Sequence, residues 1–190
     1  MERQYSGHLQ EIQSSLYVLD NFLTYEECDF LIDVAESNEN YLKCRASYRP
    51  NKGLKGEIGR YKSYGIIEQR RPDIWNLITK GKEVNGFPPV EIQINKYSPG
   101  DFIPPHKDKQ TSLHTVTVPL VDGPDCLAFG DPKAYYDGIP INESDEMGMT
   151  ISYPDVKGTG YGFDGTTPIH WVPSTISSRY TAIFLYGILI

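Results

Sequence analysis

Two stretches in the first half of the chain repeat apolar residues with the period of an α-helix. In the first, Thr24 and Glu27 form a capping box, in which the threonine accepts from a backbone N–H and the glutamate reaches back to the cap. The helix that follows carries one apolar stripe, made of Cys28, Phe30, Leu31, Val34 and Ala35. The second runs from about Pro72 to Lys82 and has proline in its first turn. The pattern therefore predicts two helices, preceded by a short strand over 16–18.

From about residue 87 the pattern changes to short apolar or alternating runs separated by glycine and proline. These runs predict strands, together with an earlier one at Tyr61–Ile67; they are Val90–Tyr97, Leu113–Leu120, Cys126–Phe129, Met149–Tyr153, Pro168–Val172 and Arg179–Ile190. Many short strands with such turns favour a β-sandwich or jelly roll. We expect one domain over 1–190, mainly β with N-terminal helices (α+β), with helical support over about 16–86 and a β-core over about 87–190.

Composition narrows the class of protein. The chain has 190 residues, of which 39% are hydrophobic and 23% charged, as in soluble globular proteins. No apolar run approaches the roughly 20 residues of a membrane helix, and the first residues do not resemble a signal peptide. The three cysteines, Cys28, Cys44 and Cys126, are scattered, which disfavours a disulfide framework or a cysteine zinc site. We expect a cytoplasmic protein without a membrane partner.

Charge is distributed unevenly along the chain. The formal net charge of −7 argues, taken whole, against nucleic acid as the main partner. Residues 43–82, however, contain eleven basic and three acidic residues, so the remainder is strongly acidic. Such a segment is either a solvated surface or a mobile lid that steers an anionic substrate. Tyrosines interleave with these basic residues, namely Tyr41, Tyr48, Tyr61 and Tyr64. They suit stacking on a nucleobase or binding of an acidic or proline-rich peptide, while ordinary strand packing is the alternative for Tyr61 and Tyr64.

Candidate metal ligands come from the four histidines of the chain. His106 and Asp108 are two residues apart, so an extended backbone points both to one side, and His170 lies on another predicted strand. Two histidines and one carboxylate leave open positions on an octahedral ion, as in non-haem Fe(II) oxygenases. By itself His-x-Asp is a weak signal, and a surface histidine beside a turn acid is the alternative. We expect packing or a supporting hydrogen bond for His114 and exposure to solvent for His8.

Arg179 begins the most apolar predicted strand. A charged residue there is costly to bury unless it is paired. An anionic co-substrate is a natural partner, because a guanidinium binds a carboxylate through two parallel hydrogen bonds. The alternative is an arginine at a strand edge whose guanidinium reaches water.

These residues together resemble the Fe(II)/2-oxoglutarate-dependent dioxygenases over about residues 16–190. His106-x-Asp108 and His170 look like the iron triad of that family, and Arg179 looks like the residue that binds the far carboxylate of 2-oxoglutarate. The resemblance implies a double-stranded β-helix (jelly roll, cupin-like) core. It also implies that Tyr97 and Asn95 contact the co-substrate. The implied cofactors are Fe(II), 2-oxoglutarate and O2, with ascorbate as a further candidate.

Two branches of the family are represented in the motifs. Asn95-Lys-Tyr97-Ser-Pro-Gly is similar to the AlkB-like enzymes, whereas the segment from His170 to Arg179 and beyond is closer to the prolyl hydroxylases. The second arginine of the AlkB-like branch is replaced by Leu185. The leading hypothesis is therefore hydroxylation of a C–H bond on a peptide or protein side chain, with release of succinate and CO2. The alternatives are AlkB-like oxidation or demethylation of a nucleobase, and a non-catalytic cupin-like module that binds a metal and a ligand.

Overall fold

The computed structural model describes residues 15–38, 43–44, 53–108, 114–146, 150–164 and 168–187. His8, Tyr41, Tyr48 and the basic residues at 45, 49 and 52 lie outside the described residues. The elements are β1 (Leu16–Leu19), α2 (Tyr25–Ser37), β2 (Lys43–Cys44), β3 (Lys62–Ile66), α4 (Pro72–Ile78), β4 (Pro89–Tyr97), β5 (Ile103–His106), β6 (His114–Pro119), β7 (Cys126–Gly130), α5 (Lys133–Tyr136), α6 (Ile141–Glu146), β8 (Thr150–Pro154), β9 (Gly160–Phe163), β10 (His170–Val172) and β11 (Arg179–Tyr186).

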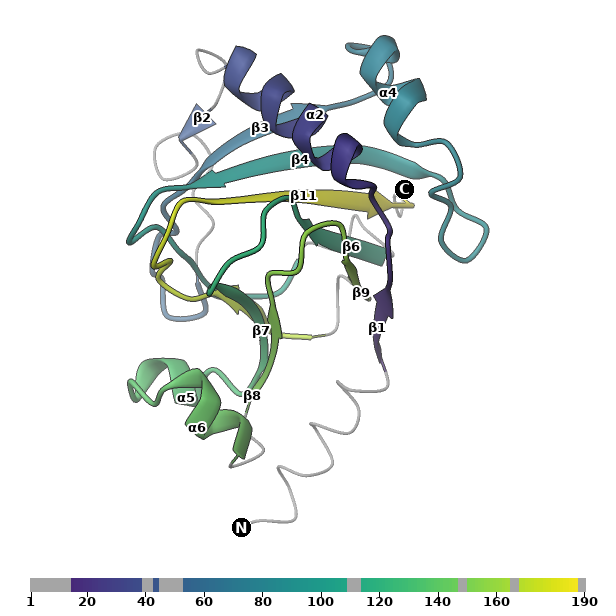
Figure 1. Cartoon of the computed structure of the whole chain (residues 1–190). Helices are drawn as coiled ribbons and strands as arrows, with labels where there is room; N and C mark the ends of the chain where they lie inside the picture. The colour runs from purple at the N-terminus through teal and green to yellow at the C-terminus, as the bar shows by residue number, and fades with distance from the viewer. Residues whose placement is uncertain are drawn as a thin grey trace.

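The strands of the described residues form two antiparallel sheets (Figure 1). The larger has seven strands in the order β1-β9-β6-β11-β4-β3-β2, and the smaller has four in the order β5-β10-β7-β8. From β4 to β11 the chain passes back and forth between the sheets, so each sheet interleaves strands that are distant in sequence. This is the winding of a jelly roll, and it confirms the predicted fold class.

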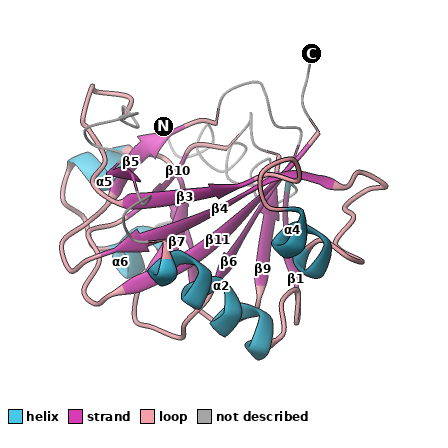
Figure 2. Cartoon of the chain, turned by 90° about the horizontal axis from the view of Figure 1, so that it is seen from above, coloured by secondary structure: helices cyan, strands magenta, loops and turns pink. Residues whose placement is uncertain are grey.

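Helices α2 and α4 cover the outer face of the larger sheet (Figure 2). The capping box at the start of α2 forms as predicted: Glu27 N–H donates to Thr24 Oγ1 at 3.2 Å, and Thr24 N–H donates to Glu27 Oε2 at 2.8 Å. The apolar stripe of α2 packs with Ile74 and Ile78 of α4 on apolar residues of β4, β6 and β11. Because this main core lies on the outer face of the larger sheet, the inner face can carry polar side chains.

Strand alternation gives β11 two different faces. Ala182, Phe184 and Tyr186 are fully buried and belong to the main core. Arg179 and Thr181 lie on the opposite face, because successive side chains of a strand alternate in direction. A second apolar cluster, which includes Tyr61, Tyr97, Phe129 and Phe163, fills part of the space between the sheets. The remaining space between the sheets is where the candidate site lies.

Some elements differ from the prediction. Helix α4 ends at Ile78 rather than near Lys82, because Gly81 takes a positive φ of 73° in the turn that follows. Strand β9 lacks an apolar alternating pattern because it reads Gly-Tyr-Gly-Phe. Its glycines allow close packing: a Cβ at Gly162 would overlap the ring of Tyr17. The short helices α5 and α6, inserted between β7 and β8, were also not predicted.

The basic segment 43–82 divides between two faces of the molecule. Residues 53–61 run beside β5, where Arg60 exchanges two backbone hydrogen bonds with Phe102 and Leu54 N–H donates to the Pro105 carbonyl at 3.0 Å. Helix α4, by contrast, lies on the outer face of the larger sheet. Arg60 and Arg71 make ion pairs with acidic neighbours, as does Lys82 with Glu27. Part of the positive charge is thus neutralised locally, and another part adjoins the strand that carries His106.

Two further sequence features have a structural counterpart. Cys28 is buried and Cys126 is half-buried, and neither forms a disulfide within the described residues; the side chain of Cys44 lies outside the described residues. Within the described ranges, none of the helices has both the length and the apolar character needed to cross a bilayer.

Candidate functional site

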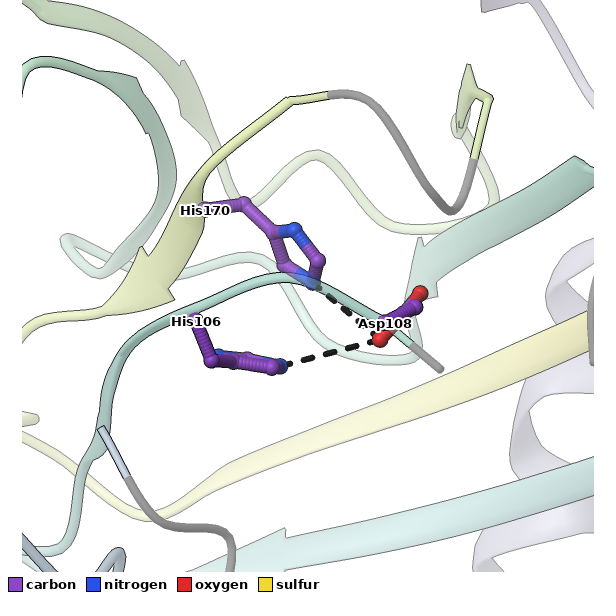
Figure 3. A group of neighbouring side chains, drawn as sticks. All are labelled: His106, Asp108 and His170. Carbon is purple, nitrogen blue, oxygen red and sulfur yellow. Dashed lines mark ion pairs between the residues drawn. The ribbon is translucent and has the colours of Figure 1, made fainter. Parts of the chain in front are cut away.

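His106, Asp108 and His170 converge on one point between the sheets (Figure 3). His106 is the last residue of β5, Asp108 follows two residues later, and His170 begins the neighbouring strand β10, directly opposite His106. Asp108 Oδ1 lies 3.7 Å from His106 Nε2 and 3.6 Å from His170 Nε2. One ligand atom from each residue lies within 4.8 Å of the others, so the structure brings the predicted ligand set together.

Both imidazoles are oriented by backbone carbonyls. His106 Nδ1 lies 2.8 Å from the Pro104 carbonyl, and His170 Nδ1 lies 3.2 Å from the Pro168 carbonyl. A carbonyl only accepts, so each Nδ1 carries a proton, and Nε2 is the ring nitrogen that faces Asp108. Metal-binding histidines are commonly fixed in this way. Burial, reinforced by His170, lowers the pKa of His106 to about 4, which keeps this imidazole neutral near pH 7.

Asp108 supplies the negative charge of the triad. Burial alone disfavours its charged form, but the nearby His170 and His106 and a hydrogen bond from Thr115 outweigh it, so its pKa lies below the usual value. Thr115 Oγ1 donates to Asp108 Oδ2 at 3.2 Å. This leaves Oδ1 directed at the two histidines. Two imidazoles and one carboxylate fit a divalent first-row metal ion with open coordination positions.

The triad opens onto a cavity of about 170 Å³ between the two sheets. Three residues of the larger sheet that were predicted to contact the co-substrate, Asn95, Tyr97 and Arg179, line this same cavity. Arg179 and Tyr97 are paired directly across β11 and β4, and Thr181 and Asn95 form the next pair. Because directly paired residues point to the same face of a sheet, these four side chains form one polar patch.

The guanidinium of Arg179 already has a protein partner. Its Nε donates to Asp155 Oδ2 at 2.5 Å and its Nη2 donates to Asp155 Oδ1 at 2.9 Å. Both side chains are 1% exposed, so the alternative in which Arg179 reaches water is wrong. The expectation that the two-bond face of the guanidinium grips a co-substrate carboxylate also needs correction, because Asp155 occupies that face. Burial alone would lower the pKa of Arg179, but the hydrogen bonds to Asp155 and its negative charge have the larger effect, so the pKa is raised.

Several buried polar atoms of this patch have no hydrogen-bond partner among the described residues. They are Arg179 Nη1, Thr181 Oγ1 and Asn95 Oδ1. Burial raises the pKa of Tyr97, despite the opposing effect of Arg179, so its phenol is neutral and able to donate. Buried polar groups normally have partners, so two such atoms on β11 and one on the neighbouring β4 point to a ligand. A carboxylate bound here would satisfy the two donors, Arg179 Nη1 and the Thr181 hydroxyl, whereas Asn95 Oδ1 is itself an acceptor.

Tyr61 forms another wall of the cavity. Its ring stacks on Tyr97 with centroids 5.7 Å apart and planes inclined by 21°. Tyr61 belongs to the basic segment 43–82, whose neighbouring residues 53–60 run beside β5. The segment therefore contributes to the cavity through an aromatic side chain.

Sequence reasoning missed Asp155, Thr181 and Thr115. Thr181 could have been found, since it lies two residues after Arg179 and therefore faces the same way on a strand. Thr115 and Asp155 had no local signal: each meets its partner only through the winding of the two sheets. His114, the histidine not assigned to the metal, is half-buried with its Nε2 3.3 Å from Asn85 Nδ2, outside the triad.

Comparison with known proteins gives structural likeness without sequence likeness. No family model and no curated protein sequence matches the chain. A prolyl-4-hydroxylase from Pseudomonas putida superposes with a TM-score of 0.60 at 13% identity, covering 96% of this chain and 98% of that one. A Trichoplax adhaerens prolyl hydroxylase, solved with a hypoxia inducible factor peptide fragment, gives 0.62 at 12% identity, covering 98% and 90%.

The likeness extends beyond prolyl hydroxylases. The carbocyclase SnoK from nogalamycin biosynthesis, described as non-heme and alpha ketoglutarate dependent, superposes with a TM-score of 0.64 at 11% identity, covering 98% of this chain and 84% of that one. At such identities the comparison establishes the fold and leaves the reaction open. The chain has the fold of the non-haem Fe(II)/2-oxoglutarate-dependent oxygenases.

Proposed function

We propose that the protein is an Fe(II)- and 2-oxoglutarate-dependent oxygenase that hydroxylates a C–H bond, with a peptide or protein side chain as substrate. The observation that carries the proposal is one cavity lined both by the His106, Asp108 and His170 triad and by the orphaned polar atoms around Arg179. A redox metal and an anionic co-substrate are the two ligands that such a pair of subsites would take. The fold is consistent with both.

The triad would hold the iron. His106 and His170 would each offer Nε2 and Asp108 would offer Oδ1, while Thr115 restrains the other carboxylate oxygen. Iron bound there would supply activation of O2, which protein side chains alone do not provide. The protein contributes fixed ligands and a site between two sheets that restricts the access of water.

The polar patch would bind the far carboxylate of 2-oxoglutarate. Arg179 Nη1, the Thr181 hydroxyl and the neutral Tyr97 phenol can each donate to it. The Asn95 amide donates to the Tyr97 oxygen at 3.3 Å. If the amide rotates away from Tyr97, Asn95 can donate to the carboxylate as well. Several donors from two neighbouring strands would fix the orientation of the co-substrate relative to the metal.

A peptide or protein side chain is the substrate class that the comparisons favour. Three of the similar structures are prolyl hydroxylases, and one of these was solved in complex with a peptide fragment. The cavity wall near the triad includes the half-buried apolar residues Ile183 and Leu185. Leu185 stands where a second arginine would be expected for the nucleobase alternative, so this part of the wall offers no additional positive charge.

The proposal is tested with purified protein under anaerobic conditions. Fe(II) together with 2-oxoglutarate should give a weak visible charge-transfer band, and admission of O2 should then produce succinate. Asp108→Ala should lose both signals by at least about a hundredfold, because it removes a charged metal ligand. His114→Ala is the matched control, since this histidine lies outside the triad. Absence of succinate above the Asp108→Ala background with any substrate would leave the non-catalytic metal-binding module as the better description.

The substrate class is tested by mass spectrometry on peptide libraries and on methylated and unmodified oligonucleotides. We expect peptides to gain the mass of one oxygen atom in an Fe(II)- and 2-oxoglutarate-dependent manner. Oxidation or methyl loss confined to oligonucleotides would replace the peptide assignment with the nucleobase alternative. In that case oligonucleotide binding should also weaken steeply with salt.

A further inference from the structure

We infer that Asp155 is a positioning residue for co-substrate binding: it holds Arg179 so that Nη1 alone is presented to the cavity. The inference rests on the proposed function, since it assigns a role to a contact of the same site. Asp155 lies just after β8 on the smaller sheet, whereas Arg179 begins β11 of the larger sheet. Their ion pair therefore joins the two sheets behind the cavity, with both side chains 1% exposed.

The geometry of the pair determines what Arg179 can offer a ligand. Asp155 accepts from Nε and from Nη2, the two nitrogens on one side of the planar guanidinium. Such a two-bond contact fixes the plane and rotation of the group. Nη1 is left without a partner among the described side chains, although Arg179 is fully buried and lines the cavity. A buried cationic N–H without an acceptor is costly, so its retention points to a ligand.

Asp155 is itself fixed by the backbone around it. Its N–H donates to the Asp125 carbonyl at 3.1 Å, and its carbonyl accepts from Gly123 N–H at 3.2 Å. Three residues further on, Gly158 is hydrogen-bonded to Leu23 and Pro119, each at 3.0 Å. The carboxylate is thus held by a loop anchored on both sides, which is the requirement for holding another side chain in place.

The pair also decides the state of the site before the co-substrate binds. With Asp155 present, the buried guanidinium has a counter-charge, and the cavity is formed in advance. Without Asp155, Arg179 would have to move or bind water. The free energy needed to reorganise the site would then lower the affinity for the co-substrate. An opposing effect exists, because Asp155 also repels the incoming carboxylate. Loss of the positioning effect would weaken co-substrate binding in a variant without the Asp155 charge, whereas loss of the repulsion would strengthen it. A binding measurement therefore shows which effect is larger.

The test compares Asp155→Asn with Asp29→Asn. Asparagine keeps the shape of Asp155 but removes its charge and places an NH2 group against the guanidinium. Asp29 forms an exposed pair with Lys157 of the same loop, at 2.5 Å, and has no contact with Arg179. Calorimetric titration of the Mn(II)-loaded proteins with 2-oxoglutarate should show binding at least about tenfold weaker for Asp155→Asn, and unchanged for Asp29→Asn. Mn(II) affinity should be the same in all three proteins. In turnover, KM for 2-oxoglutarate should rise and kcat should change little.

Folding of the variant is checked separately. Asp155→Asn should lower the melting temperature of the metal-free protein, and adding Arg179→Gln should restore much of the loss, because the double variant buries no unpaired charge. Equal or tighter binding of 2-oxoglutarate by Asp155→Asn would overturn the inference, as would a double variant no more stable than the single one. If the unaltered protein binds no 2-oxoglutarate, the proposed function itself fails. If the unaltered protein binds 2-oxoglutarate but Asp155→Asn and Asp29→Asn bind it equally well, the proposed role of Asp155 fails while the proposed function stands.

Discussion

Among single residues, Thr181 offers the clearest separation between ligand binding and stability. Its hydroxyl is buried and has no hydrogen-bond partner among the described residues. We predict that Thr181→Val leaves the free energy of unfolding of the metal-free protein unchanged or slightly raised, because no bond is broken. The same change should weaken 2-oxoglutarate binding about tenfold, through loss of a hydroxyl donor to a carboxylate. Urea unfolding and calorimetric titration measure the two effects, and unaltered 2-oxoglutarate affinity would remove Thr181 from the site.

His106 should make the metal-free protein sensitive to acid. Burial lowers its pKa from 6.5 to about 4. Between these values the unfolded chain binds a proton that the folded protein does not, so stability should decrease as pH falls through this window and be fully present above it. The expected slope is roughly 1.4 kcal/mol for each pH unit. Urea midpoints measured from pH 7 to pH 4 provide the test. His106→Gln should show a shallower dependence, and an identical slope would contradict the assigned pKa.

The sequence predicted the candidate metal ligands but only part of their surroundings. His106, Asp108 and His170 were found because metal chemistry restricts the residue types and because strand periodicity orients the first two. Arg179 was found because a charge in an apolar strand demands a partner. The identity of that partner was beyond reach, since Asp155 and Arg179 meet only when β8 and β11, from different sheets, are in place. A requirement for a counter-charge can thus be inferred from local pattern, whereas its source depends on the tertiary arrangement.

At the scale of elements, the loop after β8 is more constrained than its length suggests. Gly158 has a φ of +80°, and a Cβ there would lie 2.4 Å from the Leu23 carbonyl oxygen. We predict that Gly158→Ala destabilises the protein by more than about 1 kcal/mol, because alanine resists this φ and the clash is with backbone. Because the same loop carries Asp155, affinity for 2-oxoglutarate should fall as well. Gly138→Ala is the control: it also has positive φ, but no atom lies within 4 Å of its added Cβ. Equal 2-oxoglutarate affinity in Gly158→Ala and Gly138→Ala would show that the conformation of this loop does not affect co-substrate binding.

Elements were predicted where local pattern and tertiary role agree. Helix α2 has a capping box and a continuous apolar stripe, and its start and its buried face follow from them. Strand β9 could not be recognised because its glycines are selected by neighbours, Phe22 and Val116 at Gly160 and Tyr17 at Gly162. Helices α5 and α6 are too short to show helical periodicity. In the elements that were missed, tertiary packing determines the residue types more than local backbone preference does.

For the whole molecule, the candidate site lies across the two sheets of the jelly roll. The triad residues His106 and His170 belong to the smaller sheet, whereas Asn95, Tyr97, Arg179 and Thr181 belong to the larger one. A metal ion and 2-oxoglutarate bound together would therefore link the sheets. We predict that Mn(II) and 2-oxoglutarate together raise the melting temperature by more than the sum of their separate effects. Saturation at a hundred times the dissociation constant corresponds to about 2.7 kcal/mol. Equal stabilisation by 2-oxoglutarate without metal would contradict a shared site.

The direct pairing of Arg179 with Tyr97 has a consequence for when the site comes into being. These two residues are far apart along the chain, and their strands are neighbours only in the completed larger sheet. Pairing of sequence-distant strands is slow, since chain entropy is lost before contacts compensate for it. The groups proposed to bind the carboxylate should therefore assemble late in folding, together with the closing of the sheet. A partly folded chain would lack the proposed co-substrate site, so the proposed activity should be confined to molecules that have finished folding.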